Sequence, residues 1–126
     1  MDNQNNIPEY LTDFNNFMAT YHRGEVSGEE VGELIARMAQ HYAKYNLETV
    51  AKERRLSLVA KENESKSDEN GKPISSTKAK VYTEATDEMA DFNLSRAHLQ
   101  NIEQMINSLK ALQKGVLNEY QAMALT

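Results

Sequence analysis

Basic side chains gather in the middle of this 126-residue sequence. Residues 44–80 carry nine basic and six acidic side chains, whereas the whole chain has a net charge of −5. Lysine and arginine at this density could neutralise phosphate groups, and a nearby aromatic ring could stack on an unpaired base. The segments "AKERRLSLVAK" and "SSTKAKVY" supply the candidate nucleic-acid contacts, which are Lys52, Arg54, Arg55, Lys61, Lys78, Lys80 and Tyr82.

The same pattern also fits an ordinary solvated helix surface. Glu48 and Lys52 are four residues apart, a spacing that favours a pair along one helix. The excess of three positive charges in one chain is a weak footprint for nucleic acid, but several associated copies would multiply it. Both interpretations remain open at the level of sequence.

The sequence gives little indication of thiol chemistry, metal binding or catalysis. The chain has no cysteine, which excludes disulfides and thiol chemistry. Its three histidines share no metal-binding spacing, and no glutamate is followed by histidine three positions later. Glu84 and Glu88 share a helix face, but a solvated acidic face explains them as well as acid–base chemistry does. Phosphate-loop, dinucleotide and hydrolase motifs are missing, so we expect no enzyme, no metal and no cofactor.

The elements that must position these residues are helices. Pro8 suits a first helical position, which predicts a helix over about 8–22. Ser27 followed by Glu30 forms a capping-box pattern and predicts a second helix over about 28–63. A polar turn follows at about 64–74, centred on Asn70-Gly71, and a third helix is expected over about 76–122.

The last predicted helix carries an apolar seam at seven-residue spacing. Its members are Phe92, Leu99, Ile102, Ile106, Leu109 and Val116. Such a seam requires a partner helix along most of its length. We therefore expect an all-α, single-domain fold, with a short N-terminal helix and a long antiparallel hairpin resembling a coiled coil. Apolar surface left along such a hairpin predicts a homo-oligomer.

In this hairpin, with its turn near Gly71, residue 61 would face residue 80, and residue 54 would face residue 87. The two basic clusters would then share one half of the hairpin.

The N-terminus lacks a basic and apolar leader, and no apolar run approaches the ~20 residues needed to span a bilayer. We expect a soluble cytoplasmic protein without membrane contacts.

The order of these segments resembles the UvsY-type recombination mediators of tailed phages. The resemblance covers roughly residues 28–120: a helix ending in "KERR", a polar turn with glycine, then "SSTKAKVYTEAT" leading into "LQNIEQMINSLKALQKGVL". It implies an oligomer of helical hairpins that binds single-stranded DNA and helps load a recombinase. By position, the residues that it implies contact DNA are Lys52, Arg54, Arg55, Lys78 and Lys80.

The resulting expectation is a recombination or replication accessory protein that binds single-stranded DNA and a recombinase. The alternative is a structural, adaptor or inhibitor phage protein that acts only through protein contacts. A third class, a small-molecule binder with a pocket between protomers, is also compatible with the sequence.

Overall fold

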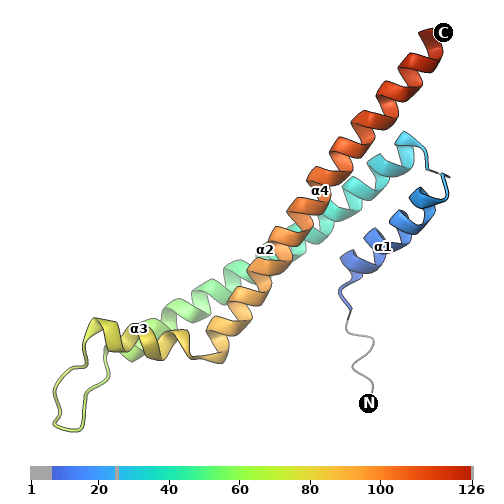
Figure 1. Cartoon of the computed structure of the whole chain (residues 1–126). Coiled ribbons are helices and arrows are strands. Elements are labelled where there is room, and N and C mark those ends of the chain that lie inside the picture. Colours follow the sequence, from blue (N-terminus) through green and yellow to red (C-terminus); the bar gives the residue numbers. More distant parts are fainter. Residues whose placement is uncertain (1–6, 25, 126) are drawn as a thin grey trace, which may run out of the picture. The chain divides into compact units, whose positions relative to one another are not determined.

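The described part of the chain is all-helical. A computed structural model describes residues 7–24 and 26–125, with the side chains of residues 120, 121, 124 and 125 excepted. Four helices follow one another in this part, and it contains no strand (Figure 1). Their bounds are α1 Glu9–His22, α2 Gly28–Glu64, α3 Ser76–Glu84 and α4 Asp87–Leu125. The predicted all-α class is confirmed.

Local signals explain where the first two helices begin. Pro8 precedes α1, and its carbonyl accepts the backbone N–H of Leu11 at 3.0 Å. At the start of α2 the Ser27 hydroxyl accepts the backbone N–H of Glu30 at 3.2 Å, which confirms the predicted cap. The predicted helix over about 28–63 agrees to within one residue with the observed α2, Gly28–Glu64.

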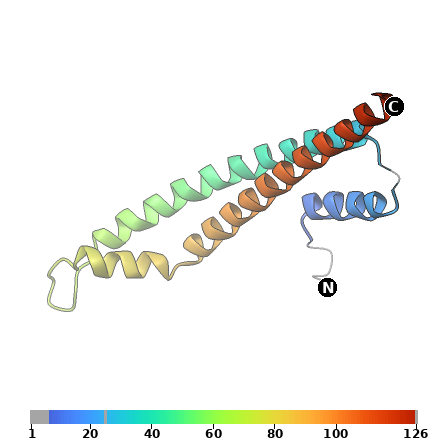
Figure 2. The ribbon, with the colours of Figure 1, turned by 45° about the horizontal axis from the view of Figure 1, so that its top comes forward.

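The third predicted helix is not continuous. Where the sequence predicts one helix over about 76–122, the structure has α3 and α4, which differ in direction where they meet at residues 85 and 86 (Figure 2). The Thr86 hydroxyl donates to the Thr83 carbonyl at 2.7 Å and accepts the backbone N–H of Met89 at 3.2 Å. Thr86 therefore caps a new helix, and Asp87 and Glu88 in the first turn of α4 favour the same start.

The chain divides into two compact units, and each is described by itself. Unit 1 comprises residues 1–43 and 100–126, and unit 2 comprises residues 44–99. The first part of α2 and the later part of α4 belong to unit 1 together with α1. The rest of these two helices belongs to unit 2 together with α3. The prediction of a single domain stays a prediction.

Unit 1 has an apolar core. The fully buried side chains come from all three of its helical segments and are Tyr10, Val31, Leu34, Met38, Ile102 and Leu109. Asp13 of α1 lies 2.9 Å from the Nε2 atom of His41 on α2, and the ring of Tyr10 packs against His41. Near the start of α2, Gln113 donates to the Gly28 carbonyl at 3.4 Å. These contacts hold α1 and α4 against the first turns of α2.

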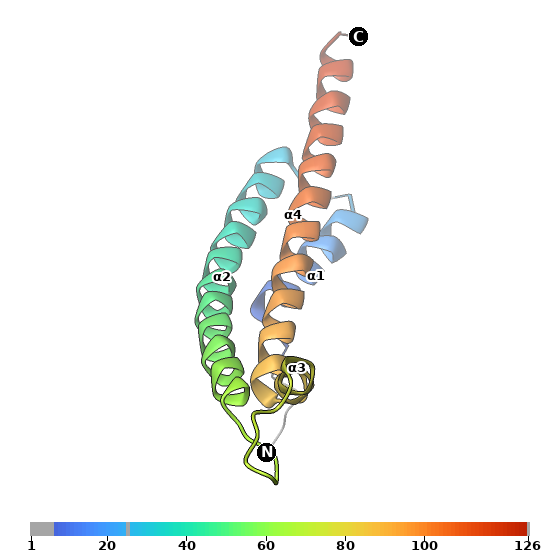
Figure 3. The same ribbon diagram turned by 90° about the vertical axis from the view of Figure 1, so that its left-hand side faces the viewer.

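Unit 2 has a core that is mostly polar. Among its described residues the buried side chains are Ala79 and four hydrogen-bonding groups, Thr49, Asn63, Thr83 and Ser95. The hydroxyls of Thr49 and Ser95 are 2.6 Å apart, and Asn63 donates to the Thr83 hydroxyl at 3.0 Å. These pairs fix α2 antiparallel to α3 (Figure 2) and beside the first part of α4 (Figure 3). The pairing of residues 63 and 83 differs by a few positions from the predicted pairing of 61 with 80.

The predicted apolar seam is divided between the units. Ile102 and Leu109 are buried in unit 1, and Ile106 and Val116 are half-buried there. Phe92 and Leu99 are half-buried in unit 2. All six therefore lose solvent contact within a single chain, so the seam is a packing surface of the chain itself. Whether copies also associate, as the sequence predicts, stays a prediction.

Candidate nucleic-acid interface

The segment between α2 and α3 is an ordered turn. The Asp68 carboxylate accepts the backbone N–H groups of Asn70 at 2.8 Å and Lys72 at 2.9 Å. An isolated antiparallel bridge joins Ser67 to Pro73. Gly71 has φ +78°, a left-handed conformation that favours glycine. The predicted Asn70-Gly71 turn is thus closed by side-chain and backbone hydrogen bonds together.

This turn brings Lys66 beside α3. The Nζ atoms of Lys66 and Lys78 each lie 5.9 Å from the centroid of the Tyr82 ring. The residue Tyr82 is 41% exposed. Ammonium groups at this distance are attracted to the ring face, so both positive charges lie close to an accessible aromatic surface.

A hollow of about 540 Å³ surrounds this group. Its lining residues are Lys66, Ser67, Asp68, Glu69, Asn70, Ile74, Lys78 and Tyr82. Two of these residues are acidic, but one oxygen of Asp68 already accepts two backbone N–H groups. An exposed aromatic ring close to two cations can hold a stacked base and an adjacent phosphate. We call Lys66, Lys78 and Tyr82 the turn site.

The other predicted contacts do not share a face with the turn site. On α2, Arg54 and Lys61 are exposed and lie, by helical periodicity, opposite the buried Thr49 and Asn63. Lys52 is half-buried on the inner side. Arg55 is exposed on a flank of the helix. The structure therefore spreads these four cations around α2 instead of gathering them.

Lys80 lies on the opposite flank of α3 from Lys78. It lines a separate hollow of about 320 Å³ together with Glu64 and Glu84. Each hollow is lined by two carboxylates, and Lys78 differs from Lys80 in lying beside the Tyr82 ring. Among the described residues, no carboxylate lies within 4.0 Å of the ammonium group of Lys66 or Lys78.

The half-buried His98 of the same unit has a shifted pKa. His98 packs against Tyr45, with ring centroids 4.9 Å apart. Burial lowers the pKa of His98 from its ordinary 6.5, the charge of Lys52 lowers it further, and Glu48 opposes the shift. Folding of unit 2 therefore favours the neutral imidazole of His98 over the protonated form.

Lys66 is the member of the turn site that is not among the residues predicted from the sequence. The pairing of residues 66 and 74 places Lys66 at the base of the turn, next to α3, because the Ile74 N–H donates to the Lys66 carbonyl at 3.1 Å. The sequence feature that could have indicated Lys66 is its position shortly before the predicted Asn70-Gly71 turn, which returns the chain toward Lys78 and Tyr82.

Comparison with known proteins gives no match to a family model, a curated protein or a solved structure. In the described part of the chain, no helix is long and apolar enough to cross a membrane. That part also holds no group of three or more histidine, cysteine, aspartate or glutamate side chains that could bind a metal ion.

Proposed function

We propose that this chain is a non-enzymatic accessory protein of phage-type recombination or replication, and that it binds single-stranded DNA at the turn site. The observation that carries the proposal is the exposed residue Tyr82, whose ring centroid lies 5.9 Å from the ammonium groups of both Lys66 and Lys78. The resemblance to UvsY-type mediators supports the DNA partner. It is also the ground for proposing a recombinase as the protein partner.

The chemistry of the turn site favours a single strand over a duplex. Stacking on Tyr82 requires a base face that is not already covered by its neighbours. Two ammonium groups neutralise about two phosphates, which for a single strand corresponds to a log–log salt slope of about −1.4 per chain. Binding by one chain is therefore weak and salt-sensitive, and assembly of several chains on one strand would strengthen it.

The test is fluorescence anisotropy with a labelled oligothymidine at low and moderate salt. The Lys66→Glu/Lys78→Glu double variant is expected to lose binding and most of the salt dependence. Tyr82→Ala is expected to weaken binding by about 5- to 150-fold, the equivalent of one stacked base, and Tyr82→Phe should keep it.

The matched control reverses two exposed lysines of unit 1, Lys110→Glu/Lys114→Glu. It makes the same change in net charge away from the turn site. Equal loss of binding in both double variants would mean a general charge effect. No binding by the wild-type chain at low salt would remove the DNA proposal.

The second candidate function is an adaptor that acts by protein contacts alone. It is favoured by three exposed apolar side chains on α2, Leu47, Val50 and Leu58. Charged substitutions at Ile102 or Leu109 cannot test it because both are buried and such changes would unfold unit 1. Leu47→Glu/Leu58→Glu is the suitable variant: the adaptor function predicts loss of assembly with the turn-site lysines dispensable.

A further inference from the structure

The outward side of α2 in unit 2 carries an apolar and basic stripe. Leu47, Val50 and Leu58 are 73%, 57% and 61% exposed. Arg54 and Lys61 fall on the same side of the helix, at spacings of three, four, four and three residues along the series. We call these five residues the α2 stripe. It lies away from the buried Thr49 and Asn63, so nothing in unit 2 covers it.

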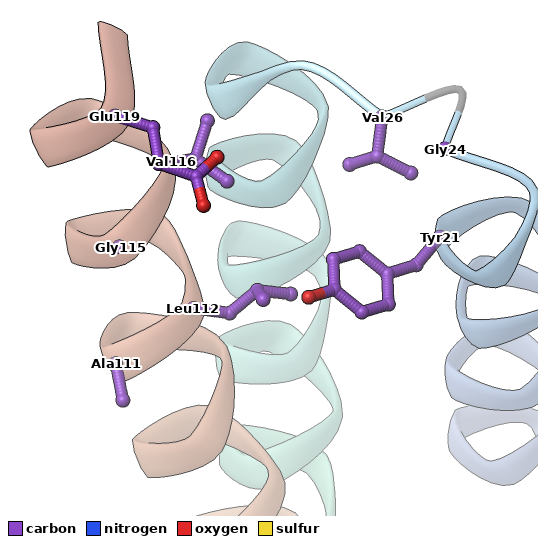
Figure 4. Close-up of a pocket in the computed structure, with 8 residues that line it drawn as sticks. All are labelled: Tyr21, Gly24, Val26, Ala111, Leu112, Gly115, Val116 and Glu119. Atoms are coloured by element: carbon purple, nitrogen blue, oxygen red, sulfur yellow. The ribbon is translucent and has the colours of Figure 1, made fainter. Parts of the chain in front are cut away.

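Unit 1 contains an apolar groove along the later part of α4. Two hollows of about 330 and 660 Å³ adjoin there and share Val26, Val116 and Glu119. Figure 4 shows Tyr21 of α1 pointing toward Leu112 of α4 across the first hollow. The second hollow continues along α4 past Leu117 to Met123. We call the two hollows together the α4 groove.

The charges of the α4 groove have one sign. Glu29 and Glu119 are its charged lining residues, and no lysine or arginine lines either hollow among the described residues. Unit 1 as a whole has four basic and nine acidic side chains. A groove of this kind favours an apolar helix that carries positive charge.

We propose that the α2 stripe of one copy docks in the α4 groove of a second copy. The groove runs from Ala111 to Met123, roughly 18 Å of helix. The stripe from Leu47 to Lys61 is roughly 21 Å long, and its apolar part, from Leu47 to Leu58, is roughly 17 Å long. The apolar side chains of the stripe supply the anchors of a helix-in-groove contact, and Arg54 and Lys61 supply charges that complement Glu29 and Glu119.

Symmetric alternatives bring like charges together. Two stripes packed antiparallel would place Arg54 against Arg54 of the other copy because it is central among the five residues. Two grooves packed together would place the glutamates of one copy against those of the other.

The proposed contact is heterologous, so each copy offers one stripe and one groove, and copies can continue into a ring or an open chain. This contact does not involve the turn site and goes beyond the proposed DNA binding.

The groove can be blocked without disturbing the core. Gly115 lines the first hollow, and a Cβ atom added there would meet nothing within 4 Å. Gly115→Leu therefore fills the groove, and leucine also favours helix over glycine. Arg54→Glu/Leu58→Glu disables the stripe at exposed positions. Gly115→Ala is the matched control for the groove variant. Lys80→Glu/Val81→Glu, also at exposed positions, makes the same change in net charge as the stripe variant.

The experiment is sedimentation velocity over a range of protein concentrations, with circular dichroism to check folding. The wild type and both controls are expected to assemble, and each disabled variant alone should be monomeric. An equal mixture of the two disabled variants should form dimers and nothing larger, since one variant keeps only its stripe and the other only its groove.

Three results would overturn the proposal. These are a wild-type chain that stays monomeric at every concentration, assembly of either disabled variant to the wild-type extent, and a mixture that remains monomeric. No nucleic acid is needed, so this contact and the DNA-binding proposal fail or stand independently.

Discussion

One of the two cations near the Tyr82 ring, Lys66, comes from a position 16 residues earlier in the sequence. Lys78 lies one helical turn away on the same flank of α3, but Lys66 reaches the ring only because the turn closes. Asp68 holds that closure through two charge-assisted hydrogen bonds to backbone N–H groups. Order in an exposed polar turn thus places a second cation at the turn site.

His98 gives unit 2 a pH dependence with a defined sign. Its pKa is lowered in the folded chain by burial and by Lys52, so the unfolded chain binds a proton more readily. The contribution of the neutral imidazole to stability is fully present above the ordinary value of 6.5 and is lost as pH falls through 6.5 toward the lowered pKa. Wild-type chain should therefore lose stability between about pH 7 and pH 5 relative to His98→Gln.

Urea denaturation of both proteins across this pH range measures the difference. The two proteins differ only at position 98, so the difference between their curves reports on His98. Parallel stability curves for the two proteins would show that His98 titrates alike in the folded and unfolded states.

At the scale of elements, polar pairs set the register of unit 2. The Thr49 hydroxyl donates to the Tyr45 carbonyl at 2.7 Å, which leaves Ser95 as the donor in the bond between the two hydroxyls. Replacing Thr49 with valine keeps the side-chain shape but leaves the buried Ser95 hydroxyl without this acceptor. We expect Thr49→Val to cost about 1–3 kcal/mol in the free energy of unfolding.

The double variant Thr49→Val/Ser95→Ala supplies the control. Removing both partners takes away the unsatisfied group, so much of the lost stability should return. A double-mutant cycle by chemical denaturation gives the coupling energy. Additive losses in the two single variants would mean that the hydroxyl pair has no special role in joining α2 to α4.

Periodicity and caps predict where α1 and α2 lie, but they do not predict the break after α3. Residues 85 and 86 are alanine and threonine, neither of which is a strong helix breaker, and the apolar spacing of the later seam can be extended back to Ala85. Only the observed hydrogen bonds of Thr86 show that its hydroxyl caps α4. Competition between a side-chain cap and helix continuation is decided by packing, which sequence spacing does not encode.

Because sequence spacing does not encode packing, it also cannot decide which of the candidate nucleic-acid contacts lie together. Sequence identifies Lys78 and Tyr82 as neighbours because helical spacing places residues four apart on one flank. It does not separate Lys78 from Lys80, since that requires knowing which side of α3 packs against α2. Buried Ala79 and Thr83 supply this information in the structure.

At the scale of the whole molecule, charge and burial are distributed differently between the units. Unit 1 carries a net charge of −5, and the ten basic and ten acidic side chains of unit 2 balance. The exposed apolar side chains of the α2 stripe and most of the cations belong to the neutral unit. Repulsion from acidic side chains is therefore weakest at the turn site and at the α2 stripe, and the acidic unit supplies the α4 groove that complements the cations of the stripe.

Differences in core chemistry predict which unit opens first. Unit 1 fully buries six large apolar side chains, whereas among its described residues the buried apolar group of unit 2 is Ala79 alone. Apolar burial is the main favourable contribution to local stability, so unit 2 should open at lower free energy. Backbone amides of α2 between residues 31 and 41 should exchange more slowly than those between residues 49 and 60.

Native-state hydrogen exchange resolved along α2 measures both ranges in one helix. This comparison controls for chain length and helix type because only the packing partners differ. Exchange should be measured at low protein concentration, since docking of the α2 stripe would protect residues 49–60 as copies associate. Equal protection of the two ranges under those conditions would mean that the polar pairs of unit 2 stabilise it as strongly as the apolar core stabilises unit 1.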